Sequence, residues 1–183
     1  MPKFLSKLRK HLDSKIVNPK HSQAELIEAF KNEANRHITE HLKYMTKSLK
    51  EIDKQMHAFF KDNEYQSVGA QDAMSKKFEE HVRFVIDGWI TTDDVLRARF
   101  KRVFVAYSAK LKTTTLMKVL DEQFVELDSE MSDHVAKANH YGNKWTEQMD
   151  KAGLVVKDRV IKTTIKWFKN LTTDELRKSY KNI

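Results

Sequence analysis

Cysteine is absent from the sequence, and glycine and proline are scarce, with four and two occurrences in 183 residues. Without cysteine the chain has no disulfides, no thiolate metal ligands and no cysteine nucleophile. Turns and hairpins depend largely on glycine and proline, so we expect few of them. The composition therefore predicts an all-α fold, an elongated helical bundle with coiled-coil character.

Long apolar runs are missing as well. The longest span about five residues, as in residues 103 to 107, whereas a helix needs about 20 apolar residues to cross a bilayer. The N-terminus lacks the apolar core of about 7 to 15 residues that defines a secretory signal. These absences predict a cytoplasmic protein, whose association with a membrane would be peripheral.

Motifs that would indicate catalysis lack essential residues. The string H-I-T-E-H from His37 to His41 matches the H-x-x-E-H pattern of inverted zinc proteases, but no third zinc ligand is evident. Residues 87 to 94 are similar to the second half of an EF-hand loop, yet Arg83 and Val85 would occupy the first and third ligand positions. No G-x-S-x-G string or glycine-rich phosphate loop occurs. We expect a non-enzymatic protein with no metal, no cofactor and no small-molecule substrate.

Charge is distributed in blocks along the chain, whose formal net charge is +8. Residues 95 to 120, the basic block, contain seven Lys and Arg and no carboxylate, whereas residues 121 to 136, the acidic block, contain six carboxylates and no Lys or Arg. No Gly or Pro lies between Asp94 and Tyr141, so both blocks are predicted on one rod helix about 70 Å long. Two such rods laid antiparallel around Val119 would neutralise each other, which predicts a dimer.

A heptad pattern is the strongest periodic signal in the chain. Ser22 and Glu25 form a capping box at the start of a helix that is predicted to run to about Asn63. Within it, apolar residues are spaced alternately by four and three positions, which is typical of a coiled-coil seam and predicts self-association through it. The seam consists of Ile38, Leu42, Met45, Leu49, Ile52, Met56 and Phe59.

Further helices are predicted from less regular signals. After a connector at residues 63 to 71, an apolar pattern predicts a helix that breaks at Gly88, before the rod begins. Gly142 is expected to kink or end the rod. Residues 153 to 171 are rich in β-branched side chains, and we predict helix there because no partner strand is evident. Thr172 begins a second capping box and predicts a short terminal helix.

Residues 1 to 20, which we call the leader, are predicted to form an amphipathic basic helix and a linker. Residues 21 to 183 are predicted to be a single helical domain. Pro19 ends any helix in the leader. Such a helix either lies at a lipid surface, with lysines near anionic headgroups, or docks on the bundle, and the sequence leaves both open. Its predicted contact residues are Lys3, Phe4, Leu5, Lys7, Leu8, Arg9 and Lys10.

The succession of leader, long helix and rod resembles the general plan of membrane-curving helical dimers of the BAR type. Our first hypothesis is a scaffold that self-associates and binds an anionic lipid surface through the leader and the basic block. One alternative is a basic nucleic-acid-binding or coat-like packaging protein, and another is a protein-binding adaptor or effector. The predicted phosphate contacts in the basic block are Arg97, Arg99, Lys101, Arg102, Lys110, Lys112 and Lys118.

Overall fold

The computed structural model describes residues 21 to 62 and 71 to 182, which form helices and no strand. The all-α prediction is confirmed for this part of the chain. The helices are α2 (Gln23–Asp62), α3 (Gln71–Ser108), α4 (Thr113–Glu126), α5 (Asp128–Lys151), α6 (Arg159–Asn170) and α7 (Thr173–Lys181).

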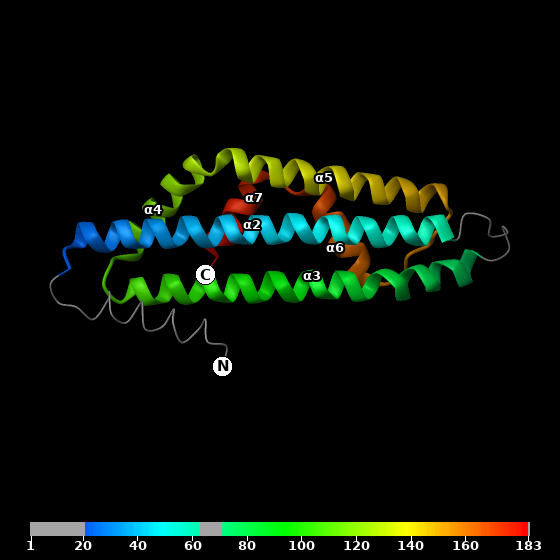
Figure 1. Ribbon diagram of the computed structural model, residues 1–183, viewed down its shortest axis with the longest axis horizontal. Coiled ribbons are helices and arrows are strands. Elements are labelled where there is room, and N and C mark those ends of the chain that lie inside the picture. Colours follow the sequence, from blue (N-terminus) through cyan, green and yellow to red (C-terminus); the bar gives the residue numbers. More distant parts are fainter. Residues whose placement is uncertain (1–20, 63–70, 183) are drawn as a thin grey trace.

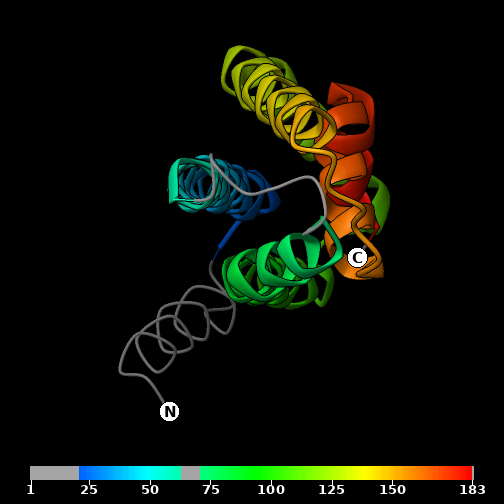
Figure 2. The same ribbon diagram turned by 90° about the vertical axis from the view of Figure 1, so that its right-hand side faces the viewer.

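Three long passes run along the length of the molecule. α2 and α3 are antiparallel neighbours, and α4 with α5 forms the third pass (Figure 1). Seen end-on, α2, α3 and α5 occupy three corners, while α6 and α7 lie crosswise along one side (Figure 2). α6 packs on α5 and α3, and α7 packs on α4 and α5. The two short helices thus close one side of an elongated bundle.

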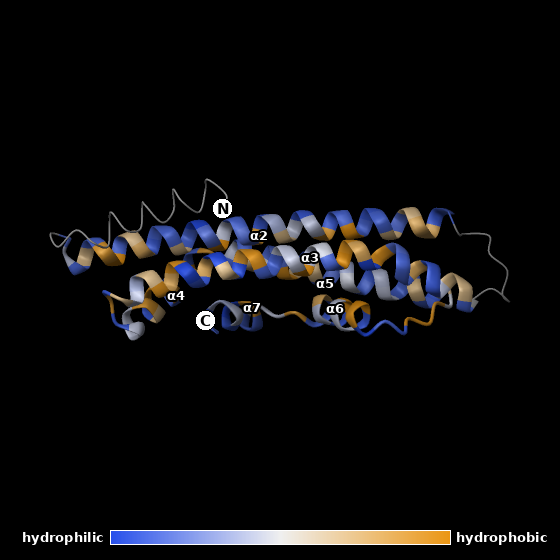
Figure 3. Cartoon of the chain, turned by 90° about the horizontal axis from the view of Figure 1, so that it is seen from below, coloured by the Kyte–Doolittle hydropathy of each residue, from blue (hydrophilic) through white to orange (hydrophobic). Residues whose placement is uncertain are grey.

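The predicted seam of α2 lies in the core. All seven seam residues are buried, with at most 4 % of their surface exposed. Hydrophobic and hydrophilic residues alternate along the helices, as expected for amphipathic helices around a shared core (Figure 3). α2 contacts α3, α4 and α5, so a single chain covers the seam by itself. The seam is a packing face within the chain, and a second copy would have to bind elsewhere.

The predicted single rod over residues 95 to 141 is wrong. α3 ends at Ser108, and the chain turns at residues 109 to 112 before α4 begins. The apolar pattern continues across the turn because Leu111 and Leu116 are both buried in the same core. Periodicity therefore could not reveal this turn, which contains neither Gly nor Pro. The resemblance to the BAR plan depended on the rod and loses that basis.

The predicted break at Gly88 is also wrong, because α3 runs through it. The hydroxyls of Thr91 and Thr92 donate to the carbonyls of Asp87 and Gly88, each at 2.8 Å. These hydroxyls therefore bond within α3 and do not cap a new helix. Gly88 is exposed, and a Cβ added there would meet nothing within 4 Å, so this glycine interrupts no packing.

The C-terminal third of the chain contains two short helices, of which the second is capped as predicted. α5 continues through Gly142 to Lys151, and residues 152 to 158 connect it to α6, which is shorter than the predicted helix over residues 153 to 171. At the start of α7, the Glu175 N–H donates to Thr172 Oγ1 at 3.1 Å and the Thr172 N–H donates to Glu175 Oε2 at 3.2 Å. The second capping box is confirmed.

Candidate anion-binding surface

Half of the contact residues predicted from the sequence belong to the leader. Residues 3 to 10 lie outside the described part of the chain, so their role stays a prediction. The other half belongs to the basic block, which the turn at residues 109 to 112 divides between α3 and α4. The basic block is therefore not presented on one straight helix.

Arg97 faces a polar cluster inside the bundle. Its Nε donates to Asp93 Oδ2 at 2.8 Å, and its guanidinium lies 5.5 Å from the ring centroid of Tyr180. His41 Nε2 lies 2.7 Å from Asp93 Oδ1, and His41 Nδ1 lies 2.6 Å from the Tyr180 hydroxyl. A neutral His41 with its proton on Nε2 satisfies both contacts. Arg97 thus helps to hold α7 against α2 and α3, and it is engaged within the protein.

The remaining cations of the basic block are more accessible. Lys101 and Arg102 on α3, Lys110 and Lys112 in the turn, and Lys118 on α4 are exposed, and none forms an ion pair with a described residue. These five side chains are available to phosphate. They are spread over two helices and a turn, so they form a dispersed positive surface.

Arg99 is half-buried on α3. The aromatic side chains interleaved with the basic block, Phe100, Phe104 and Tyr107, are at most 7 % exposed. Bases cannot stack on buried rings, so these residues do not form a platform for single-stranded nucleic acid. Binding of nucleic acid here would have to use the exposed cations and not ring stacking.

Much of the acidic block is neutralised within the chain. Three of its carboxylates form ion pairs with cations of α2 and α7, so their charges do not require a second copy. The pairs are Lys31 with Glu126, Arg177 with Asp128, and Lys181 with Asp121.

A second basic surface lies on α6, where Lys162, Lys166 and Lys169 are spaced by four and three positions. We call these residues the lysine row. All three are exposed, and none forms an ion pair with a described residue. They line a pocket of 590 Å³ whose other lining residues include Met149 and Ile165 and no carboxylate. A row of positive charge in a pocket whose lining contains no carboxylate attracts anions.

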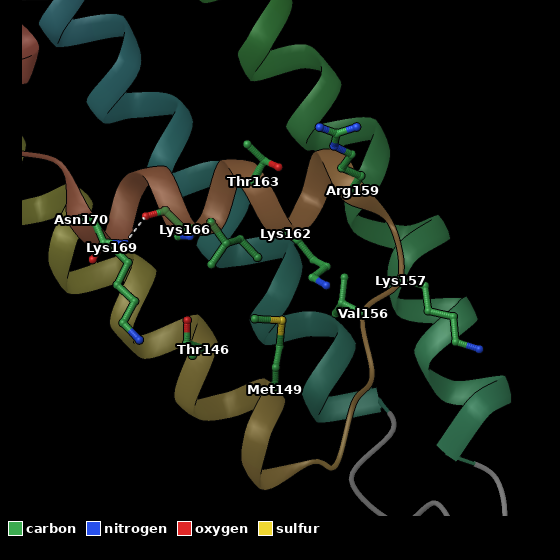
Figure 4. Close-up of a pocket in the computed structure, with 11 residues that line it drawn as sticks. Thr146, Met149, Val156, Lys157, Arg159, Lys162, Thr163, Lys166, Lys169 and Asn170 are labelled. Carbon is green, nitrogen blue, oxygen red and sulfur yellow. Dashed lines mark hydrogen bonds between the residues drawn. The ribbon is translucent and has the colours of Figure 1, made fainter.

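The side chains of the row differ in direction from the basic residues beside them. Lys162 and Lys169 extend from α6 toward α5, on the side where Met149 lies (Figure 4). Lys157 and Arg159 extend away from this space (Figure 4). The lysine row therefore forms the cationic part of the pocket, and the other two residues stand at its edge.

One face of α3 fixes the N-terminal end of α6. Asp158 accepts hydrogen bonds from the N–H groups of residues 160 and 161 at 2.9 and 3.1 Å, which caps the helix. Arg83 donates to the other oxygen of Asp158 at 2.6 Å. Ser75 and Glu79, on the same face of α3, accept from N–H groups of the connector at residues 152 to 158. The helix N-terminus is therefore occupied by protein groups.

Two residues of α5 fix the C-terminal end of α6. Asn139 Nδ2 donates to the carbonyls of Phe168, Lys169 and Leu171 at 2.8, 3.2 and 3.1 Å, which satisfies groups that a helix end leaves without partners. Gly142 lies against the backbone of Lys169, and a Cβ added to it would be 2.6 Å from the Lys169 nitrogen. This close approach sets the distance between α5 and α6.

The buried histidines are held by protein groups. No cluster of three His, Asp or Glu side chains that could hold a metal occurs among the described residues. Burial lowers the pKa of His41. His37 Nε2 lies 3.6 Å from Glu33 Oε2, and this contact, with a hydrogen bond from Arg36 at 2.9 Å, lowers the pKa of Glu33 to about 2. His134 lies 2.9 Å from Thr46 Oγ1, and burial lowers its pKa to about 4. These histidines support the packing of the bundle.

The lysine row was not singled out from the sequence. The β-branched residues around the row bear on the choice between helix and strand and give no indication of a binding site. The signal was nevertheless present, because from Arg159 to Asn170 the chain has four basic residues at helical spacing and no carboxylate.

Comparison of the chain with protein-family models, with curated proteins and with solved structures found no match. In the part of the chain that the structure describes, no helix combines the length and the apolar character needed to cross a membrane. The exposed cations are therefore the features of the described residues that point to a function.

Proposed function

We propose that this protein is a non-enzymatic helical scaffold that binds an anionic membrane surface, with the lysine row as a principal contact. The observation that carries the proposal is three exposed ammonium groups on one helix face around a pocket without a carboxylate. Each basic residue close to an anionic leaflet contributes about 1 kcal/mol, so the row would contribute about 3 kcal/mol. The exposed cations of the basic block, and the contacts predicted from sequence for the leader, would add to this attraction.

Co-sedimentation with vesicles tests the proposal. The protein is expected to pellet with vesicles that contain phosphatidylserine and to remain in solution with neutral phosphatidylcholine vesicles. Replacement of all three lysines of the row by glutamate is expected to reduce the bound fraction strongly. Absence of pelleting with anionic vesicles would contradict the proposal.

A matched control uses lysines on another helix. Lys47, Lys50 and Lys54 of α2 are also exposed and helically spaced, but Glu51 and Asp53 lie among them in the sequence. Their replacement by glutamate changes the net charge by the same amount. A similar loss of binding in both variants would indicate dependence on net charge alone, and the lysine row would have no special role.

The alternatives from the sequence are tested in the same experiment. Duplex DNA in place of vesicles tests whether the protein binds the phosphates of nucleic acid. If it does, its affinity for DNA is expected to fall steeply as salt rises. Replacement of Leu8 by glutamate is expected to weaken vesicle binding and to leave DNA binding unchanged, because it removes the apolar stripe of the leader. Binding to neither partner would favour the adaptor or effector.

A further inference from the structure

We infer that the pocket between α5 and α6 is a specific site for a compact ligand that carries two or more phosphate groups. The inference deepens the proposed function and rests on it in one respect, since the same face of α6 would meet the membrane. Beyond the proposed function, the pocket would select its ligand by the positions of the phosphate groups. Diffuse attraction depends on total charge, whereas a pocket with positioned cations depends on where the phosphates lie.

The spacing of the lysine row indicates more than one phosphate. Lys162 and Lys169 are seven positions apart on one helix, which separates their Cα atoms by about 10 Å along the axis. Both side chains extend over the same space (Figure 4), and Lys166 lies between them in the sequence. One phosphate can contact only neighbouring members of such a row. Two phosphates on a small scaffold would use the whole row.

The lining of the pocket suits the rest of such a ligand. Met149, Val156 and Ile165 provide apolar surface beside the lysines in a volume of 590 Å³, which lies within the usual range of small-molecule sites. An apolar floor can pack against the face of a carbon ring while the lysines bind the phosphates at its edge.

Two other grooves in the described part of the chain lack this combination. A groove of 910 Å³ that α2 and α3 line includes Glu51 and Asp87. A groove of 410 Å³ that α2 and α5 line includes Glu130 and Asp133 together with several lysines. Carboxylates in these linings would repel phosphate and compete for the cations. The α5–α6 pocket has neither disadvantage.

The backbone beneath the lysine row is already positioned. Asp158 and Arg83 hold one end of α6, and Asn139 and Gly142 hold the other. A ligand would therefore order only the side chains, which lowers the entropic cost of binding. Because Asp158 occupies the N–H groups at the helix start, the lysine ammonium groups must supply the recognition.

Two measurements on the full chain test this site. Isothermal titration calorimetry with inositol hexakisphosphate, compared with inorganic phosphate at equal ionic strength, measures binding of a soluble ligand. Co-sedimentation compares vesicles of equal total charge that contain either phosphatidylserine or a bisphosphorylated phosphoinositide.

The variant Lys162→Gln/Lys169→Gln removes the two outer cations, and Lys47→Gln/Lys54→Gln is the control. All four positions are exposed, so the fold is expected to be retained, which circular dichroism checks.

We expect inositol hexakisphosphate to bind at least about tenfold more tightly than inorganic phosphate, a difference of about 1.4 kcal/mol, and the pocket variant alone to lose this preference. A preference for phosphoinositide vesicles supports a lipid headgroup as the source of the phosphates. Soluble binding without that preference supports a free polyphosphate. Equal binding to both vesicles with no soluble binding overturns the specific site and leaves the proposed function standing. Soluble binding with no vesicle binding keeps the site and overturns the proposed function.

Discussion

At the scale of single residues, Gly142 is a position where an added methyl group would meet backbone atoms of another helix. In Gly142→Ala the new Cβ would be 2.6 Å from the nitrogen and 2.9 Å from the Cα of Lys169, and backbone atoms cannot move aside as a flexible side chain can. We expect the free energy of unfolding to fall by about 1 to 3 kcal/mol, as for other overpacked contacts. Urea unfolding followed by circular dichroism measures this change.

Gly88→Ala is the matched control, because Gly88 also lies within a helix and a Cβ there meets nothing within 4 Å. Alanine is favoured over glycine inside a helix by about 0.5 to 1 kcal/mol, so this variant should be more stable than the wild type. A Gly142→Ala protein with the same gain as Gly88→Ala would contradict the close contact between α5 and α6.

We expect His134 to make the stability of the protein depend on pH. Burial lowers the pKa of His134 to about 4, with repulsion from His41 in its protonated form as the second cause, whereas a histidine in an unfolded chain has a pKa of about 6.5. Well above pH 6.5 both states are neutral, and pH has no effect through this group. As the pH falls toward 4, only the unfolded chain takes up the proton, so the native state loses up to about 3 kcal/mol. Urea midpoints between pH 7 and pH 4.5 measure this loss.

His134→Gln is the control for this prediction, since its amide can still meet Thr46 and does not titrate in this range. The variant should lose less stability than the wild type between pH 7 and pH 4.5. His41, whose pKa is also lowered by burial, contributes a loss of the same sign that remains in the variant. Identical pH profiles for the two proteins would contradict a buried, neutral His134.

The roles of some residues could be predicted from sequence spacing. The roles of others depend on residues that only the folded chain brings close. The burial of the seam residues followed from their spacing, because seven apolar side chains at heptad positions need a packing face. Arg97 was predicted to contact phosphate, yet Asp93 and Tyr180 engage it. Tyr180 is 83 positions away in the chain, and no local pattern places it beside Arg97.

At the scale of elements, Asn139 connects α5 to the end of α6. In Asn139→Ala the carbonyls of Phe168, Lys169 and Leu171 lose a donor, and those shielded from water would be left without a partner. We expect a loss of about 1 to 3 kcal/mol in the free energy of unfolding. Hydrogen exchange should show the largest increase in α6. Asn143→Ala, an exposed position one turn later, should change little.

The end of a helix could be predicted where a capping side chain marks it. It could not be predicted where packing against the core determines it. The capping box at Thr172 is written in four consecutive residues, so the sequence shows it directly. The end of α3 has no such signal. Leu111 and the buried apolar residues of α4 lie in the same core as those of α3. The chain reverses direction at residues 109 to 112, which brings them there. The site on α6 was missed for a related reason, since its pocket requires α5 beside it.

At the scale of the whole molecule, ion pairs and hydrogen bonds fasten the passes of the bundle to one another. Asp53 of α2 accepts from Lys144 Nζ at 2.8 Å and from Trp145 Nε1 at 2.9 Å on α5. The three ion pairs of the acidic block join α2 and α7 to α4 and α5. The acidic block therefore helps to hold the helices of one chain together. Its position in the sequence did not indicate this role.

Self-association stays a prediction, and because the α2 seam is buried within one chain it would have to use another surface. The carboxylates in the three intrachain pairs are each more than half exposed, and such surface pairs contribute about 0 to 1 kcal/mol, so a second copy could exchange them at little cost. If two α4 helices pair antiparallel around residue 120, exposed Lys118 of one copy faces Glu122 of the other. We therefore expect a dimer at low salt that dissociates as salt screens the charges. Lys118→Glu should abolish it, and Lys118→Glu with Glu122→Lys should restore it. Light scattering measures the mass of each protein, and a wild-type monomer at every salt concentration would contradict self-association.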